Sequence, residues 1–548
     1  MQERSFEARR AVAAALAAIV ALGGVPAAVA QEAGPAAPVS VPTLVTEVPP
    51  APELVVEDGR ILLQLEDAIL LALRRNLGLA VERYGHQQAL LDILGSRGIY
   101  DLRARLDASV ADQESPTLSE LIGVPVEESD FRNSTFSLTQ LTPWGGEAQL
   151  SFDANRRATN DVTQRFNPSY SGSGDFSFRQ PLLRDFGRLT TERPIIQARL
   201  ASGQSREFFE QQVTDLLLDV ENAYWDLVEA GEQLDVARQS LELARELHER
   251  NRIQVDVGTL APIELVQSEA TIATRDEEII SAEARLGDAA DRLLQLLNLG
   301  AAMAEGLSVE PRTDPQTEPV AIDVDQAIVT ALAERPEVRQ QQLQVERLEV
   351  DARFFRNQKL PTTDLTVGYG SQALASPALG TDLVDVFSDV ASREFTGWQI
   401  GVLMAMPIQN RGARAQSAIA DLGLERGRTV LDELELDIAT EVRAAARRVR
   451  TAEQQITSAQ ASVRLQERNL EAEQRRYENG MSTSFRITEI QEDLTAARSR
   501  LVSAITNYRR ALTAYHRATG RLLEESGVEL TGPVEVELPR RTIGSLFR

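Results

Sequence analysis

The sequence predicts a mainly α-helical protein that also contains a β-sheet part and consists of two similar halves. Three observations support this fold class. One segment recurs in the second half, apolar residues follow coiled-coil spacing over a very long stretch of each half, and shorter segments alternate apolar and polar residues. Each half is therefore expected to run from a helix through strands to a very long helix, a tight turn and a return helix.

The N-terminal 60 residues are expected to stay outside this fold. Residues 1–30 have the parts of a secretory signal peptide: arginines near the start, an apolar run over residues 11–22, and the small-residue cleavage site Ala28-Val29-Ala30. Residues 31–60 follow as a linker rich in proline and alanine, a composition that cannot build a core. The alternative is an uncleaved anchor helix, which needs about 20 apolar residues, and glycines and a proline interrupt the apolar run.

The two halves open with a similar segment. LEDAI at residues 65–69 recurs as VDQAI at residues 324–328, and the turn at Gly258 recurs at Gly480. The repeat is too long for a solenoid unit, which indicates a duplicated half-protein whose structure begins near Leu63. The expected domains are a first repeat over residues 61–300, a second repeat over residues 301–525 and a C-terminal tail over residues 526–548.

Two helices of unusual length are predicted, over about residues 194–257 and 412–479. In both stretches, apolar residues follow one another in alternating steps of three and four, the spacing of a coiled-coil seam. Pro194 fits a first helical turn, and Gly258 and Gly480 are placed to end the helices. At about 1.5 Å per residue each helix would be about 100 Å long. A generic coiled coil explains this feature alone, but it does not explain the strands.

Strands are predicted within residues 100–183 of the first half and 361–408 of the second. Apolar and polar residues alternate over residues 102–110, and apolar residues alternate with mostly small or polar ones over residues 398–406. A period of two gives a strand one apolar and one polar face. The apolar face fits either a soluble sheet packed on the helices or a β-barrel in a membrane, with polar residues facing a wet lumen.

The strand region of the first half contains an additional predicted hairpin. Residues 134–142 and 146–157 flank a Pro/Gly turn with the sequence TPWGG. The segments 156–174 and 371–394 are expected to be long outer loops. Six strands per chain would mean either a wider barrel or a hairpin that is folded elsewhere.

The composition argues against several classes of protein. The net charge of -25 at pH 7 argues against a nucleic-acid partner, which needs a basic surface. The chain has no cysteine, so it lacks a thiol nucleophile and a zinc–thiolate site. Its three histidines (His86, His248 and His516) lack metal-binding spacing, and the sequence contains no phosphate-binding loop or nucleophile elbow. We therefore expect no enzyme activity, no cofactor and no metal.

From about residue 61 to residue 525, the sequence resembles the TolC family of outer-membrane efflux proteins, also called outer membrane factors. The resemblance rests on the repeated opening segment, on the strand-to-helix transitions QPLL at 180–183 and MPI at 406–408, and on GTLA at 258–261. Its most specific part is GMSTSF at 480–485. That part is followed by Gln491, Leu494, Ala497, Arg498 and Gly520.

The resemblance implies a homotrimeric outer-membrane β-barrel that is continuous with a periplasmic α-helical coiled-coil barrel. In the family, four strands from each of three chains form one twelve-stranded barrel. A location in the outer membrane is implied, with contact to its lipid and an extension into the periplasm. The implied partners are a periplasmic adaptor (membrane fusion) protein and an inner-membrane pump. The implied function is a channel, the exit duct of a tripartite efflux or type I secretion system, for passive export of small molecules or proteins.

The resemblance also implies that the two hairpin turns contact the adaptor. Glycine permits the positive φ that such a turn needs. The alternative is a turn that binds no partner. The implied contact residues are Gly258, Thr259 and Leu260 in the first half, and Gly480, Met481, Ser482 and Thr483 in the second.

The same tips would carry the aperture and gating residues Glu489, Arg486, Glu264 and Tyr477. Glu489 matches an acidic aperture position, whereas Arg486 stands where the family pattern often has an acid. Tyr477 and Glu264 match a latch pair, but Ser482 replaces the usual basic partner. A threefold ring of Glu489 would repel itself and attract cations. Alternatively, Arg486 and Glu489 are a turn-spaced solvated pair of little energetic consequence.

One function of another class stays open, a periplasmic coiled-coil scaffold with a small soluble sheet and no transport activity. A scaffold would be extracted without detergent and would give no ion conductance. Within the channel class, small-molecule efflux and protein secretion both fit the sequence.

Overall fold

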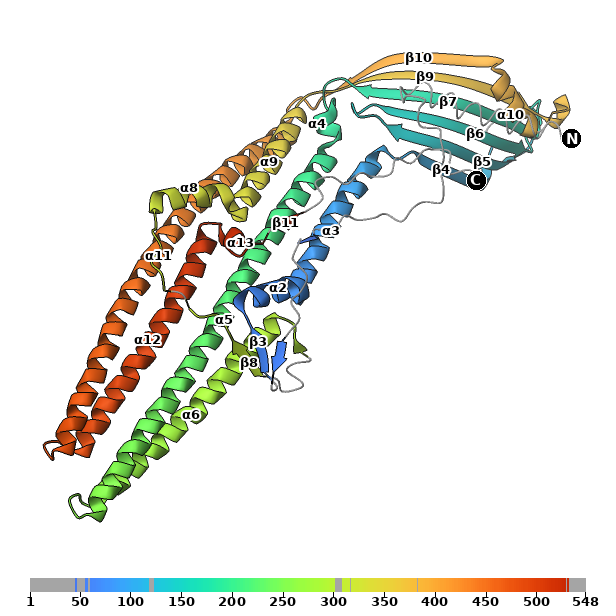
Figure 1. Cartoon of the computed structure of the whole chain (residues 1–548). Coiled ribbons are helices and arrows are strands. Elements are labelled where there is room, and N and C mark those ends of the chain that lie inside the picture. The colour runs from blue at the N-terminus through green and yellow to red at the C-terminus, as the bar shows by residue number, and fades with distance from the viewer. Residues whose placement is uncertain are drawn as a thin grey trace.

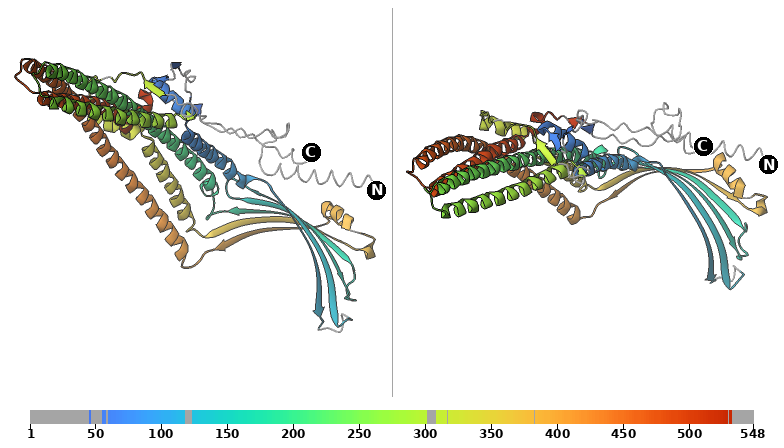
Figure 2. Two further views of the ribbon diagram at one scale, coloured as in Figure 1. Left: turned by 90° about the horizontal axis from the view of Figure 1, so that it is seen from below. Right: turned by 60° about the horizontal axis from the view of Figure 1, so that its bottom comes forward.

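The computed structural model describes residues 45–46, 55–57, 60–117, 123–300, 308–315, 317–381, 383–528 and 530–531. The molecule is elongated, with a sheet at one end and two helical hairpins at the other (Figure 1). Figure 2 shows the curvature of the sheet from two further directions. The predicted signal peptide lies outside the described residues, as does most of the predicted linker.

Each half contains one helix that is far longer than the rest. α5 (Arg193–Asp256) has 64 residues and α11 (Arg411–Glu478) has 68. α6 (Ile263–Leu296) packs back along α5, and α12 (Ser484–Ala518) packs along both α11 and α5. The shorter helices are α2 (Leu65–Arg75), α3 (Leu77–Arg97), η2 (Gly98–Tyr100), α4 (Arg188–Thr191), α8 (Val324–Glu334), α9 (Pro336–Asn357), η4 (Pro377–Leu379), α10 (Leu383–Ser392) and α13 (Leu522–Glu525).

Local sequence explains where several helices begin. The Asp323 carboxylate accepts hydrogen bonds from the N–H groups of Asp325 and Gln326 at 3.1 Å and so caps α8. Pro336 occupies the first turn of α9, where its missing N–H costs no hydrogen bond. The Asn76 side chain caps α3 by accepting from the N–H of Leu79 at 3.0 Å. None of the helices in the described part of the chain is long and apolar enough to cross a membrane.

A small sheet near the middle of the molecule begins earlier than the sequence indicates (Figure 1). β2 (Val55–Glu57) pairs with β3 (Arg60–Leu63), and β3 runs parallel to β8 (Ser308–Pro311). A separate pair joins β1 (Val45–Thr46) to β11 (Leu530–Thr531). The expectation that structure begins near Leu63 is therefore wrong. Most of these pairings connect segments from opposite parts of the sequence, so no local pattern indicates them.

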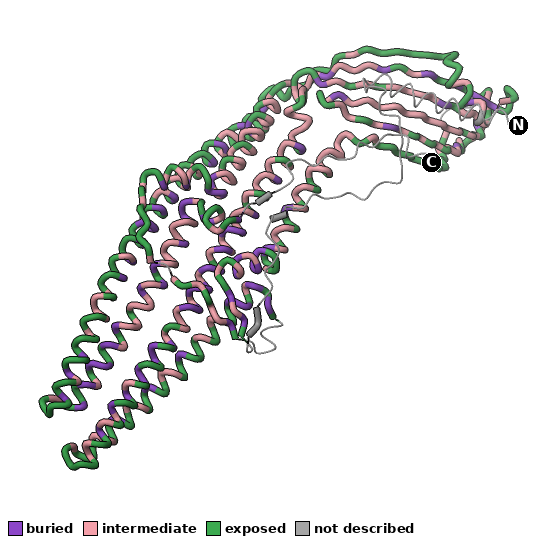
Figure 3. Tube along the Cα trace, in the orientation of Figure 1, coloured by how far each residue is buried: buried purple, intermediate pink, exposed green. Residues whose placement is uncertain are grey.

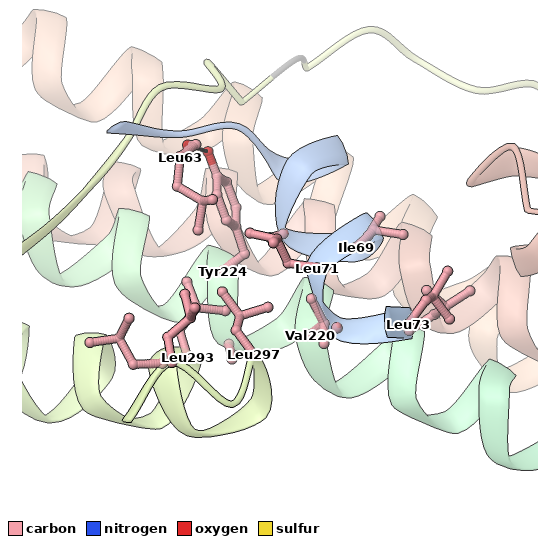
Figure 4. Close-up of a cluster of buried hydrophobic side chains, with 14 of the residues drawn as sticks. Leu63, Ile69, Leu71, Leu73, Val220, Tyr224, Leu293 and Leu297 are labelled. Carbon is pink, nitrogen blue, oxygen red and sulfur yellow. Dashed lines mark hydrogen bonds between the residues drawn. The ribbon is translucent and has the colours of Figure 1, made fainter. Parts of the chain in front are cut away.

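The largest apolar core lies where α2 and the small sheet pack against α5 and α6 (Figure 4). Leu71 of α2 and Val220 and Tyr224 of α5 are fully buried there. The Tyr224 hydroxyl donates to the carbonyl of Leu63 at 3.1 Å and accepts from the N–H of Thr313 at 3.0 Å, so its burial leaves no polar group unpaired. Elsewhere, buried positions recur along the paired helices, as coiled-coil spacing requires (Figure 3).

A cluster of five charged side chains joins the halves where α5, α9, α11 and α12 meet. Arg335, only 4% exposed, contacts Glu337 at 3.1 Å and Glu441 at 2.5 Å. Arg517 contacts Asp215 at 3.1 Å, Glu337 at 3.3 Å and Glu441 at 3.1 Å. Burial opposes the ionisation of Glu337, but hydrogen bonds from Arg335 and its charge outweigh burial and hold the pKa of Glu337 below its ordinary value.

Six long strands form one antiparallel sheet in the order β10-β9-β7-β6-β5-β4. The strands are β4 (Arg103–Pro116), β5 (Val126–Leu141), β6 (Glu147–Thr159), β7 (Ser169–Pro181), β9 (Thr362–Ala375) and β10 (Phe395–Ala405). The additional hairpin of the first half is β5–β6, and it lies inside this sheet rather than elsewhere. Through short connections, α3 leads into β4, β7 into α5, α9 into β9 and β10 into α11. β5 and β6 connect only to other strands.

The register gives this sheet one apolar and one polar face, because directly opposed residues on neighbouring strands lie on the same face. One row crosses all six strands and is apolar throughout: Ala104, Leu138, Leu150, Phe176, Tyr369 and Trp398. The next row, on the other face, is polar or glycine: Arg105, Ser137, Ser151, Asp175, Gly370 and Gly397. Trp398 is 77% exposed and Leu106 is 72% exposed. The long helices therefore do not cover the apolar face, contrary to the soluble-sheet alternative.

A short helix covers part of the apolar face at the end of the sheet farthest from the helical hairpins (Figure 1). Val386 of α10 is fully buried on β9 and β7, and the Phe387 ring stacks on Phe152 with 4.6 Å between ring centroids. Gly172 permits this approach, since a Cβ at that position would collide with Val386. The expected long loop over residues 371–394 is therefore wrong, because part of that segment extends β9 and part forms α10.

Candidate functional site at the helical tips

The two hairpin turns lie at the end of the molecule opposite the sheet, and their backbones are alike. Gly258 has φ 78° and Gly480 has φ 68°, a conformation that glycine adopts without steric cost. The N–H of Thr259 bonds to the carbonyl of Gln254 at 2.9 Å, and the N–H of Met481 bonds to the carbonyl of Arg476 at 2.9 Å. Each of these hydrogen bonds runs from an N–H group to the carbonyl five residues earlier, so α5 and α11 end in the same way.

The predicted tip residues are mostly exposed, and large apolar side chains lie among them. Gly258, Thr259, Gly480, Met481 and Thr483 are exposed, whereas Leu260 and Ser482 are half-buried. Val257 is 68% exposed and Phe485 is 70% exposed. Both turns therefore present apolar side chains to the surroundings in the single chain.

Tyr477, a predicted gating residue, joins the second hairpin to the first. It is buried, and its hydroxyl donates to Asn251 Oδ1 at 2.7 Å and lies 3.1 Å from Gln254 Oε1, both on α5. Burial raises the pKa of the Tyr477 phenol, and the Glu264 carboxylate raises it further. The phenol therefore keeps its proton at neutral pH and remains a hydrogen-bond donor.

Glu264, the predicted partner of Tyr477, is bonded instead to Ser484. The Ser484 hydroxyl, at the start of α12, donates to the Glu264 carboxylate in the first turn of α6. Ser482, which stands at the position of the family's usual basic partner, donates to Glu473 at 2.5 Å within its own hairpin. The structure thus places two separate bonds between the hairpins, Tyr477–Asn251 and Ser484–Glu264, in place of the single predicted pair.

Further contacts join the same hairpins above the tips. Gln491 donates to the carbonyl of Leu243 at 3.2 Å, and Thr495 donates to Ser240 at 3.1 Å. Arg275 of α6, 7% exposed, contacts Glu492 of α12 at 3.1 Å. The two tip bonds are therefore the last members of a polar seam between the hairpins.

Arg486 and Glu489 form an ion pair on the outside of α12. Their side chains are 2.5 Å apart and about half exposed, at 53% and 48%. In the single chain this is the turn-spaced solvated pair of the alternative interpretation. An aperture role for Glu489 requires neighbouring copies of the chain and belongs to the proposal below.

Sequence reasoning missed Asn251 and Ser484, although Asn251 leaves a signal. It continues the apolar seam of α5 after Ala244 and Leu247, at the next coiled-coil step, and it is 1% exposed. A polar residue at a buried seam position needs a polar partner, which here is Tyr477. In the described part of the chain, no group of three or more histidines, aspartates or glutamates is arranged to hold a metal ion.

Comparisons with known proteins agree with this architecture. The outer membrane efflux protein family matches residues 147–299 and 327–521. The solved outer membrane protein VceC of Vibrio cholerae has a TM-score of 0.61 and 14% identity over 83% of this chain and 96% of that chain. The Campylobacter jejuni outer membrane channel CmeC has a TM-score of 0.57 and 16% identity, over 90% of this chain and 94% of that chain.

The open state of the Neisseria gonorrhoeae MtrE outer membrane channel is also similar. It has a TM-score of 0.55 and 16% identity, over 90% of this chain and 98% of that chain. No curated protein matches the sequence. At these identities the solved structures share the fold of this chain.

Proposed function

Because the chain belongs to the outer membrane efflux protein family, we propose that it is one protomer of a passive exit duct in a tripartite efflux or type I secretion system. The protein is located in the outer membrane. In the proposal, three copies surround one axis, the sheets form the wall in the membrane, and the helices form a tunnel across the periplasm. Small molecules or proteins pass through the duct without a reaction on the chain.

The observation that carries this proposal is the two-faced sheet at the end of the long helices. Its apolar row runs across all six strands, and the long helices leave it uncovered. In a membrane wall the apolar face meets lipid, and the polar face, with Arg105 and Asp175, meets water. A soluble scaffold would leave this large apolar surface in water, which soluble proteins avoid.

The helical tips support a role in assembly and gating. Val257, Met481 and Phe485 are apolar and exposed there, as expected for a surface that a partner covers. We assign this surface to the helical hairpin of a periplasmic adaptor, which connects the duct to an inner-membrane pump. Tyr477, Glu264, Arg486 and Glu489 form the gating region, in which the bonds between hairpins hold the tip shut.

Membrane extraction combined with planar-bilayer recording tests this function. The protein is expected to leave the membrane fraction only with detergent and to give discrete single-channel conductance steps after purification. Two results together would favour the periplasmic scaffold. The protein would be extracted by salt or alkaline buffer alone, and the tip variants described in the Discussion would give no conductance.

Replacing Arg486 by Ala is expected to increase the cation selectivity of the open channel. Arg486 neutralises Glu489 at 2.5 Å, so its removal leaves three uncompensated carboxylates around the axis. The ratio of cation to anion permeability, measured from the reversal potential in a salt gradient, should rise about twofold or more. Glu489→Gln is the matched variant and should lower the ratio. Equal ratios in both variants and the wild type would place Glu489 away from the aperture.

A further inference from the structure

The β5–β6 hairpin is an insertion into the sheet between strands that connect to helices. Four strands of the sheet connect to the helical part, at α3, α5, α9 and α11. β5 and β6 instead lie between β4 and β7. β5 pairs with β4, β6 pairs with β7, and the two strands of the hairpin pair with each other. The sheet of one chain is therefore two strands wider than its connections to the helices require.

The hairpin carries the same two faces as the rest of the sheet. Leu138 and Leu150 continue the apolar row, and Ser137 and Ser151 continue the polar row on the other face. A hairpin folded across the lumen or over the outside would not need this match to both neighbouring strands. Its side chains therefore fit a membrane wall as well as those of the other four strands do.

The turn of this hairpin is fixed to the junction between sheet and helices. Thr142 and Gly146 close the turn with an N–H to carbonyl bond of 2.7 Å. The carbonyl of Trp144 accepts from the N–H of Gly187 at 3.2 Å and from the Gln180 side chain at 3.2 Å. Gly187 directly precedes α4, so the turn rests on the corner where the chain leaves the sheet for α5.

The two edges of the sheet fit a second copy of this chain. β4 has 14 residues and β10 has 11, and each pairs with one neighbour among the described strands. β10 contains no charged residue, and its Trp398 and Ile400 side chains are exposed. A long, uncharged edge strand of this kind is prone to pair with another strand. Because six antiparallel strands alternate in direction, β10 of one copy runs antiparallel to β4 of the next, and the apolar and polar faces continue across the joint.

We infer that three copies of this chain close one ring of eighteen strands, six from each copy, through β10 of one copy and β4 of the next. This inference rests on the trimer of the proposed function and makes the membrane wall wider than the twelve-stranded ring that the family resemblance implies.

The wider ring also matches the helical part in size. With strands about 4.8 Å apart and tilted by about 40°, eighteen strands give a ring about 36 Å across, against about 24 Å for twelve. Three copies supply twelve helices at the level of α3, α5, α9 and α11. At about 9.5 Å between axes, twelve helices form a ring about 37 Å across. A ring of eighteen strands therefore continues the helical tunnel with little change of width.

Cysteine cross-linking of the full chain tests the inference, because the natural chain contains no cysteine. The first pair is Ser151→Cys with Asp175→Cys, which are directly opposed on β6 and β7. The second pair is Arg105→Cys with Asp175→Cys, which lie in the same row but are three strand spacings, about 14 Å, apart. A third set combines Gln399→Cys on β10 with Arg103→Cys, Arg105→Cys or Asp107→Cys on β4, all on the polar face.

After purification in detergent, a short thiol cross-linker is added, and bonds within a chain are located by peptide mass mapping. The first pair is expected to bond, the second to stay free, and at least one member of the third set to give cross-linked dimers and trimers on denaturing gels. Bonding of the second pair would overturn the inference, because β4 and β7 would then be neighbours in a four-strand wall. Bonding of the first pair alone, with no cross-linked species from any member of the third set, would overturn the ring itself and with it the proposed trimer.

Discussion

The double variant Tyr477→Phe/Ser484→Ala is expected to convert a mostly closed channel into a mostly open one. Both substitutions remove a bond between the hairpins near the tip, Tyr477–Asn251 and Ser484–Glu264. At about 1 kcal/mol for each bond, three protomers lose about 6 kcal/mol of closed-state stabilisation. A change of about 5.5 kcal/mol is enough to move a two-state equilibrium from 1:99 to 99:1. The open probability in planar-bilayer recordings measures this shift.

Ser482→Ala is the matched control for this variant. It removes a serine hydroxyl of the same tip, but that hydroxyl bonds to Glu473 within one hairpin and holds nothing across to the other. The control should therefore keep the open probability of the wild type. An equal rise in the control and the double variant, or no rise in either, would contradict the assignment of Tyr477 and Ser484 to the gate.

Arg335→Ala is expected to be the most destabilising single substitution outside the membrane part. The substitution removes the cation closest to Glu337 and leaves Arg517 as the partner of Glu441. The site is buried, since Arg335 itself is only 4% exposed. Removing one member of a buried ionic cluster costs about 3–5 kcal/mol, because the remaining charges lose their compensation. Thermal unfolding of the detergent-purified protein, followed by circular dichroism, measures the loss.

Arg353→Ala, on the same helix α9, provides the control. Arg353 is 58% exposed and pairs with Glu349 one helical turn away, so its loss should cost less than about 1 kcal/mol.

The stability of the wild type and that of Arg335→Ala should also depend differently on pH in the acidic range. The pKa of Glu337 in the folded chain is lowered from its ordinary value of 4.5. The ionised carboxylate therefore adds to the free energy of unfolding above pH 4.5, and this contribution is lost as the pH falls through the lowered pKa of the folded chain. The wild type should lose this contribution on acidification, and Arg335→Ala should show a flatter dependence.

The sequence is sufficient to predict the elements whose signals are local. The seams of α5 and α11 repeat over many turns, and Gly258 and Gly480 stand where a positive φ is needed, so the long hairpins follow from spacing alone. The alternation along residues 102–110 and 398–406 likewise indicates the strands. Their two faces appear in the structure as rows that cross the whole sheet.

Features that depend on distant partners could not be predicted in this way. β3 needs β8 from the other half. The ten residues from Leu383 to Ser392 read as a loop until β7 and β9 supply the surface on which they pack as α10. The bonds of Tyr477 and Glu264 depend on the rotation of α11 and α12 against α5 and α6, which a resemblance to other proteins does not specify. Asn251 stands out in the sequence as a polar residue in the seam of α5, but its partner Tyr477 comes from the other half. Ser484 has no comparable signal, and its role follows from its bond to Glu264 on the other hairpin.

We propose that copies of this chain enclose a continuous passage from the periplasm through the outer membrane. Electron cryomicroscopy of the detergent-extracted protein, reconstituted into lipid nanodiscs, would reveal such a passage. We expect three copies around one axis, with the six-stranded sheets closed into a wall in the lipid and a water-filled passage leading into the helical tunnel. A single chain, or an assembly whose sheets lie outside the lipid and enclose no passage, would contradict it.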